Sequence, residues 1–104
     1  MKEITVQELK SKLDAGEDIQ VIDVRETDEY QYCNIGALHI PMGEIIMKAD
    51  QLARDKQVVI HCKSGGRSGN VVNALTARGF NNVVNLRGGI LAWAEQIDPS
   101  LPTY

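Results

Sequence analysis

The stretch that decides the fold of this chain is Val58-Val59-Ile60-His61-Cys62-Lys63-Ser64-Gly65-Gly66-Arg67-Ser68. Its apolar and neutral residues predict a buried strand over 57–61 that ends beside Cys62. The two glycines free the backbone to curl, and the following residues predict a helix over 68–78. Such a loop turns several N–H groups inward and adds the positive end of a helix dipole, so an anion is favoured at its centre. The side chain nearest that centre is the thiol of Cys62.

A cysteine thiolate is both an anion and a nucleophile, so the loop predicts a reactive thiol at Cys62. A cysteine after a buried strand can instead be a small core residue. That alternative does not explain the loop residues, which would be poor core partners: Ser64, Gly65, Gly66, Arg67 and Ser68. A Walker-type phosphate loop is not predicted, because the G-x-x-x-x-G-K-S/T spacing is absent.

The bulk composition indicates one small domain over residues 1–104 with an aliphatic core, since 43% of residues are apolar and only 5% are aromatic. The net charge of −3, without a basic stripe, disfavours nucleic acid as a partner. No apolar run is long enough to span a membrane, and residues 1–4 lack the apolar stretch of a signal peptide. We therefore expect a cytoplasmic protein with no membrane partner.

The two cysteines, Cys33 and Cys62, are expected to be free thiols in a reducing cytoplasm. No C-x-x-C pair exists, and His39 and His61 lie far apart in the sequence. We therefore expect no metal site. No cofactor is expected either.

The remainder of the chain alternates strands with helices. Predicted strands begin at Ile4 and cover 19–24, 36–40, 57–61 and 83–86. Predicted helices cover 5–13, where Thr5 and Glu8 are spaced as a capping box, a short segment capped by Thr27, and 43–52, 68–78 and 88–97. Residues 98–104, with two prolines, are expected to form a surface tail. This order predicts an α/β fold with a parallel sheet of about five strands and helices on both faces.

Ligands of parallel sheets bind at the carboxyl ends of the strands, and Cys62 lies at such an end. Arg25 follows the 19–24 strand and Arg87 follows the 83–86 strand, so we expect both cations on one rim with the thiol. Asp23 is predicted to pair with Arg25 and to position the loop.

Four segments, in order, carry a family resemblance. They are Asp23-Val24-Arg25-Glu26 with Glu29-Tyr30, Ile35-Gly36-Ala37-Leu38-His39-Ile40-Pro41, Cys62 through Ser68, and Gly88-Gly89-Ile90 with Trp93. Together they resemble the rhodanese (thiosulfate sulfurtransferase) domain in its small single-domain form. One departure is Cys33-Asn34-Ile35, where the family usually has Gly-His-Ile. This variant, followed by Ile-Pro-Met-Gly-Glu, looks like the rhodanese domains fused to enzymes that activate sulfur-carrier proteins.

The resemblance implies a sulfurtransferase in which Cys62 takes the outer sulfur of thiosulfate, becomes a persulfide and passes the sulfur to cyanide or a thiol. It implies a small anionic donor and a thiol acceptor as partners, with a sulfur-carrier or persulfide protein as a further partner. The N–H groups from Lys63 to Ser68 would stabilise the thiolate and then the persulfide.

Several residues keep two interpretations at this stage. Lys63 attracts anionic thiosulfate or is a solvated surface lysine, and Ser64 donates its hydroxyl to the bound sulfur or only shapes the turn. Arg67 holds the active loop through carboxylate or carbonyl bonds or forms a purely structural salt bridge. Trp93 is interpreted as core. His61 is interpreted as structural, because adjacent strand residues point to opposite faces.

Two other functions remain open. A cysteine phosphatase or arsenate reductase is suggested by His61-Cys62 and a following arginine, but only four residues separate Cys62 from Arg67, one fewer than in H-C-x5-R. The second open function is that of a non-enzymatic persulfide carrier or interaction domain. Cys33 is interpreted as a buried packing residue, with a resolving thiol that forms a disulfide with Cys62 as the alternative.

Overall fold

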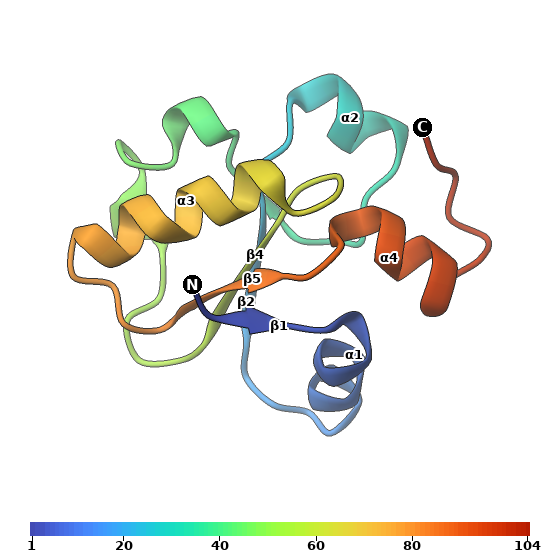
Figure 1. The fold of residues 1–104 in the computed structure, drawn as a ribbon, viewed down its shortest axis with the longest axis horizontal. Helices are drawn as coiled ribbons and strands as arrows, with labels where there is room; N and C mark the ends of the chain where they lie inside the picture. The colour runs from blue at the N-terminus through green and yellow to red at the C-terminus, as the bar shows by residue number, and fades with distance from the viewer.

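The computed structural model describes residues 1–104 and places five parallel strands in one sheet (Figure 1). The strands are β1 (Glu3–Ile4), β2 (Gln20–Asp23), β3 (Leu38–His39), β4 (Val58–His61) and β5 (Val83–Leu86), in the spatial order β1-β5-β4-β2-β3. All four residues of the central strand β4 are buried, as expected for a strand covered on both faces. The predicted α/β class, strand count and parallel pairing are therefore confirmed.

Four helices and two short 3₁₀ turns cover this sheet. They are α1 (Val6–Asp14), α2 (Thr27–Tyr32), η1 (Met42–Glu44), η2 (Ala49–Gln51), α3 (Gly66–Ala77) and α4 (Gly89–Gln96). α1 and α4 share one apolar cluster, and α3 packs into another with the segment that holds η1 and η2. None of the four α-helices has the length and apolar character that crossing a bilayer requires.

The predicted N-cap is present at the start of α1 but not at the start of α2. At α1 the predicted capping box is present, with Thr5 N–H donating to Glu8 Oε1 at 2.9 Å and Glu8 N–H donating to Thr5 Oγ1 at 3.1 Å. At α2 the predicted cap, Thr27, is wrong, because it is the first helical residue and Glu26 is the N-cap. The N–H of Glu26 donates to Glu29 Oε1 at 3.0 Å, which is the half of a capping box in which the N3 side chain accepts from the N-cap backbone.

The single helix predicted over 43–52 is also wrong, since this segment forms η1, a turn and η2. Only Ile45 and Leu52 are buried, whereas Ile46 and Met47 are exposed. Two buried side chains anchor the segment without requiring a continuous apolar helix face. Gly43 and the two adjacent isoleucines also have low helix propensity, so propensity does not extend the turns into an α-helix.

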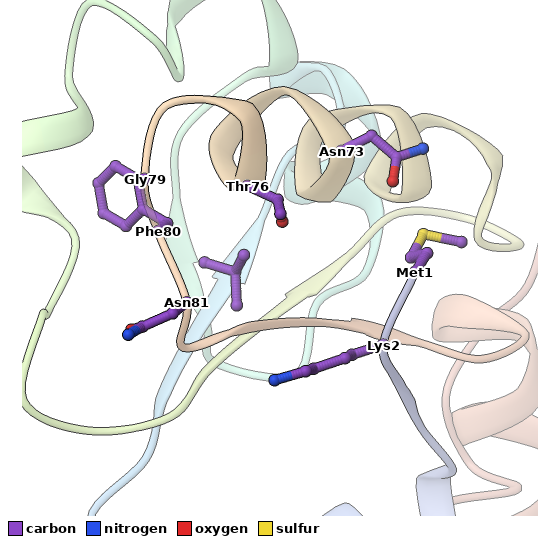
Figure 2. Close-up of a pocket in the computed structure, with 8 residues that line it drawn as sticks. Met1, Lys2, Asn73, Thr76, Gly79, Phe80 and Asn81 are labelled. Carbon is purple, nitrogen blue, oxygen red and sulfur yellow. The ribbon is translucent and has the colours of Figure 1, made fainter.

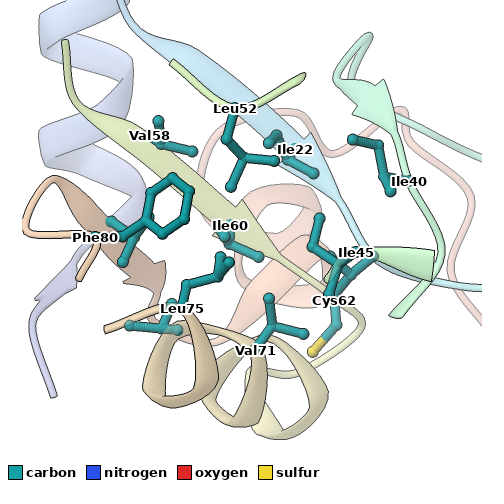
Figure 3. Packing of buried hydrophobic residues seen from close by; sticks show 13 residues of the cluster. Ile22, Ile40, Ile45, Leu52, Val58, Ile60, Cys62, Val71, Leu75 and Phe80 are labelled. Carbon is teal, nitrogen blue, oxygen red and sulfur yellow. The ribbon is translucent and has the colours of Figure 1, made fainter. Parts of the chain in front are cut away.

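The larger apolar cluster lies between β2, β4 and α3 and includes Cys62 (Figure 3). Alternate residues of β4 point to opposite faces, so Val58 and Ile60 belong to this cluster and Val59 to the other. Cys62 continues the first set and lies at the α3 end of the cluster in Figure 3. The strand alternation therefore aims the thiol at the start of α3.

Candidate active site

Cys62 directly follows β4, and only 1% of its surface is exposed. Its Sγ lies 3.1 Å from the backbone N of Gly65 and 3.3 Å from Oγ of Ser68. Gly65 ends the loop that leaves the strand, and Ser68 lies in the first turn of α3. The thiol is therefore enclosed by hydrogen-bond donors from residues 63–68, which directly follow it in the chain.

Gly65 makes this curl possible. Its φ is +111°, in the left-handed region that residues with a Cβ rarely adopt, and it is the N-cap of α3. The helix begins at Gly66, two residues earlier than the predicted 68–78. Because of this earlier start, the first turn of α3 with its unpaired N–H groups lies against the sulfur.

The loop lowers the pKa of the Cys62 thiol below its ordinary value. Burial alone raises the pKa, because it disfavours the charged form. The Ser68 hydroxyl and the backbone N–H groups of Ser68, Gly65 and Ser64 outweigh burial by stabilising the thiolate. Among the loop N–H groups expected to stabilise the thiolate, that of Gly65 lies 3.1 Å from Sγ, and those of Ser64 and Ser68 also lower the pKa.

Asn85 on β5 ties the loop to the sheet, and sequence reasoning did not select it. Its Oδ1 lies 2.5 Å from Ser68 Oγ and is an alternative acceptor to Cys62 Sγ for the single proton of that hydroxyl, and its Nδ2 donates to Gly65 O at 3.1 Å. The side chain is 2% exposed. The available signal was a lone polar residue inside the apolar run 83–86, since a buried amide must find partners.

The start of α4 supports the loop from its other side. Ile90 N–H donates to Cys62 O at 3.0 Å and Leu91 N–H donates to Lys63 O at 3.1 Å. Gly89 has a φ of +58°, and a Cβ built on it would lie 2.5 Å from Lys63 O. Gly89 therefore lets the helix approach the loop backbone closely, a role that sequence reasoning did not assign.

Arg67 forms a two-pronged ion pair with Glu29 of α2. Its Nη1 donates to Oε1 at 2.6 Å and its Nη2 donates to Oε2 at 2.9 Å. Hydrogen bonding to Arg67 holds the pKa of Glu29 at about 2, although its partial burial acts in the opposite direction. The guanidinium is thus directed to α2, which agrees with the predicted carboxylate bond. The sequence did not identify Glu29 as its partner.

The predicted Asp23–Arg25 ion pair is present, with Nη2 donating to Oδ2 at 2.7 Å and both side chains fully buried. Arg25 also donates to Cys33 O at 2.7 Å and to Tyr104 Oη at 3.0 Å. None of its hydrogen bonds reaches the residues from Cys62 to Ser68. Any effect of this pair on the loop must therefore pass through its neighbours.

His61 is buried beside this pair, with Nε2 3.7 Å from Asp23 Oδ2 and no hydrogen-bond partner for that nitrogen. Burial lowers the pKa of His61 and keeps the imidazole neutral. Its Nδ1 contacts the carbonyl of Cys62 at 3.2 Å, not the thiol. The imidazole therefore does not contact the sulfur.

The cations near the loop do not all face the thiol. Lys63 is half-buried, with Nζ 4.5 Å from the ring centroid of Tyr104. Arg87 follows the carboxyl end of β5 as expected, but its side chain is directed to β1, where Nε donates to Glu3 Oε1 at 3.2 Å. β1 is the outermost strand next to β5, so this pair draws the guanidinium away from β4.

The side chain of Ser64 is exposed and makes no hydrogen bond. Ser64 therefore acts on the sulfur through its backbone N–H and not through its hydroxyl.

Trp93 and Cys33 lie apart from the chemistry. Trp93 packs against the cluster on the α1 side of the sheet, in agreement with the prediction. Cys33 is buried and free, and its Sγ lies 3.8 Å from Arg25 Nη1. No group of three or more His, Cys, Asp and Glu side chains is arranged to hold a metal ion.

The largest cavity, about 540 Å³, lies between the N-terminal segment and the end of α3 (Figure 2). Its lining does not include Cys62 or the loop that surrounds it: Met1, Lys2, Asn73, Thr76, Gly79, Phe80, Asn81 and Val83. The thiol therefore lies outside this hollow. The candidate site is therefore the hydrogen-bonded loop around Cys62 and not this cavity.

Comparison with known proteins shows the family to which the chain belongs. The Rhodanese-like domain family matches residues 5–96. The chain is 43% identical over 100 residues to "Putative sulfurtransferase YtwF" of Bacillus subtilis, a match that covers 95% of this chain and 96% of that one. It is 36% identical over 104 residues to "Probable adenylyltransferase/sulfurtransferase MoeZ" of Mycobacterium tuberculosis, covering 97% of this chain and 26% of that one. A solved structure of thiosulfate sulfurtransferase from Pseudomonas aeruginosa superposes with a TM-score of 0.86 at 28% identity, covering 99% of this chain and 20% of that one.

Proposed function

Because this chain belongs to the rhodanese-like domain family, we propose that it is a sulfurtransferase that carries sulfane sulfur as a persulfide on Cys62. The family resemblance of the sequence is thereby confirmed, including its likeness to a domain fused to an adenylyltransferase. The observation that carries the proposal is the enclosure of one thiol by the N–H groups and hydroxyl of a single loop.

In the first step the Cys62 thiolate attacks the outer sulfur of thiosulfate. A new S–S bond forms to Cys62, the S–S bond of thiosulfate breaks, and sulfite leaves with the electron pair of that bond. Charge and atoms balance, because thiolate and thiosulfate become persulfide anion and sulfite. No general base is needed when the thiol is already ionised, and the loop N–H groups favour that state.

In the second step an acceptor nucleophile attacks the outer sulfur of the persulfide. Cyanide leaves as thiocyanate and a thiolate leaves as a new persulfide, and in both cases the electron pair returns to Cys62 as thiolate. The donors around Sγ serve both anions, since thiolate and persulfide differ by one sulfur atom. The proposed physiological partners are thiosulfate or a persulfide donor and a thiol acceptor, with a sulfur-carrier or persulfide protein in either role.

A phosphatase or arsenate reductase is the competing function, and the position of Arg67 argues against it. A phosphatase loop needs a guanidinium that forks around the phosphate oxygens. Here both terminal nitrogens of Arg67 bind the Glu29 carboxylate at 2.6 and 2.9 Å. The loop therefore offers backbone N–H groups to a single sulfur and keeps its arginine outside.

A paired assay tests the proposal. The wild-type protein should form thiocyanate from thiosulfate and cyanide, and Cys62→Ser should lose nearly all of that turnover while keeping the circular dichroism spectrum and unfolding transition of the wild type. Turnover of an aryl phosphate without any turnover of thiosulfate would replace the proposal with the phosphatase function. Equal turnover by Cys62→Ser would remove Cys62 from the mechanism.

A further inference from the structure

The segment after α4, expected to be a surface tail, returns to α2 (Figure 1). Its Tyr104 contacts Glu29 of α2 and Lys63 of the loop that follows Cys62. Tyr104 Oη accepts from Arg25 Nη1 at 3.0 Å and donates to Glu29 Oε2 at 2.5 Å. Its hydroxyl therefore links the buried Asp23–Arg25 pair to the Glu29–Arg67 pair. Tyr104 thus adds a second link between Arg25 and Glu29, since Arg25 Nη1 also donates to Glu29 O at 3.3 Å.

The Tyr104 ring also has defined partners. The edge of the Tyr32 ring meets it at a centroid distance of 5.9 Å and an interplanar angle of 78°, and Tyr32 Oη donates to Thr103 O at 3.4 Å. The Lys63 ammonium lies 4.5 Å from its centroid. A cation over an aromatic face is held without being neutralised, because the ring carries no net charge.

Lys63 has no carboxylate partner, unlike the arginines around it. Arg25 is paired with Asp23, Arg67 with Glu29 and Arg87 with Glu3, whereas no carboxylate lies within ion-pair distance of Lys63. Lys63 is also the residue next to Cys62 in the chain. Its charge is therefore the uncompensated positive charge available to an anion that approaches the thiol.

We propose that Tyr104 is a positioning residue, which holds Lys63 at the active loop so that an anionic sulfur donor meets an uncompensated charge. The inference rests on the proposed function for the identity of the donor, a small anion with a terminal sulfur. The placement of the Lys63 charge by Tyr104 does not depend on sulfur transfer. The charge acts on the approach of the donor, so discharge of the persulfide to a neutral acceptor does not depend on it.

Alkylation of Cys62 by a charged and by a neutral reagent separates the electrostatic effect of Lys63 from the intrinsic reactivity of the thiol. Iodoacetate is an anion and iodoacetamide is neutral, so the ratio of their rate constants reports the positive charge felt at the thiol. Lys63→Met should lower this ratio about threefold at low salt, the size expected for one charge within a Debye length. Tyr104→Leu should lower it by a similar factor, Tyr104→Phe should retain it because the ring remains, and Lys10→Met on the distant helix α1 should leave it unchanged.

The double variant Lys63→Met/Tyr104→Leu should show no further loss, because both changes remove the same positioned charge. A wild-type ratio in Tyr104→Leu, or losses that multiply in the double variant, would overturn the inference. Tyr104→Leu should also raise KM for thiosulfate several-fold with little change in kcat. Absence of thiosulfate turnover in the wild type would defeat the proposed function alone, since the alkylation ratio still tests Tyr104 and Lys63.

Discussion

Helices α3 and α4 begin alike, yet their N-termini face different atoms of the same loop. Each follows a strand, and each has a left-handed glycine as its N-cap, Gly65 with φ +111° and Gly88 with φ +77°. At α3 the N–H groups face the sulfur of Cys62. At α4 the N–H groups of Ile90 and Leu91 face the carbonyl oxygens of Cys62 and Lys63.

The difference shows that stabilising an anion requires support on both sides of a loop. A peptide unit is planar and trans, so its C=O and the following N–H point in opposite directions. When Leu91 holds Lys63 O on the outside, the N–H of Ser64 is directed inward. That N–H is among the groups that lower the pKa of Cys62. α3 therefore supplies charge stabilisation, and α4 orients part of it.

Removing the close approach of α4 should have the largest effect. In Gly89→Ala the added Cβ would lie 2.5 Å from Lys63 O on a backbone with φ +58°. Overpacking and strain together should cost roughly 3 kcal/mol of unfolding free energy, measured by urea denaturation. The displaced loop should also shift the pH inflection of Cys62 alkylation upward.

Gly79→Ala provides a matched control for Gly89→Ala. Gly79 has a φ of +93°, and no atom lies within 4 Å of the position where its Cβ would be. It should show only the backbone cost of about 1 kcal/mol, with an unchanged alkylation profile. Equal losses in the two variants would mean that the contact between α4 and the loop is not the cause.

The α3 side of the comparison is tested through Ser68. Ser68→Ala removes a buried hydroxyl that contacts both Sγ and Asn85 Oδ1, so the pKa of Cys62 should rise. A hydrogen bond to a charged group is worth about 1.5 kcal/mol, so alkylation below the inflection should slow roughly tenfold. Thr76→Ala, which removes a hydroxyl that bonds Val72 O in the same helix, should leave the rate unchanged. An unchanged rate in Ser68→Ala would assign the stabilisation to the backbone alone.

The sequence was sufficient to predict the parallel sheet, the loop and the Asp23–Arg25 pair, because each depends on residues adjacent in the chain or on a strand pattern. It was not sufficient for Glu29, Asn85 and Tyr104. Glu29 meets Arg67 38 residues away and Tyr104 75 residues away, and only the assembled fold determines such pairings. Gly89 was part of a recognised signature, but its reason, contact with the loop backbone, required the structure.

The Glu29–Arg67 ion pair, which supports the loop from outside, should make a moderate and pH-dependent contribution to the free energy of unfolding. The pKa of Glu29 is lowered from its ordinary value of 4.5 to about 2, chiefly by hydrogen bonding to Arg67. The unfolded chain therefore binds a proton first as the pH falls, so this contribution is full above about pH 4.5 and is lost toward pH 2. Glu29→Gln should cost roughly 1 kcal/mol at pH 7 and should reduce the loss of stability between these pH values.

Glu44→Gln is the control, because Glu44 pairs with Lys48 at the same 2.6 Å distance but with both side chains more than 40% exposed. Solvent screening should limit its cost to a few tenths of a kcal/mol. Urea denaturation at pH 7 and pH 3 measures both variants. Identical pH dependence in wild type and Glu29→Gln would show that the Arg67 ion pair does not support the loop.

The smallest effect on sulfur transfer is expected at Cys33, a second buried thiol without a helix N-terminus directed at it. Cys33 follows the last turn of α2, and its own N–H and O are used by Glu29 O and Arg25. Cys33→Ala should therefore keep most sulfurtransferase activity and cost about 1 kcal/mol of stability for the lost packing. After thiosulfate treatment, mass spectrometry should find one added sulfur atom on the peptide that contains Cys62 and none on the peptide that contains Cys33. A disulfide between the two cysteines would contradict this prediction, because it would make Cys33 a resolving thiol and the persulfide a short-lived intermediate.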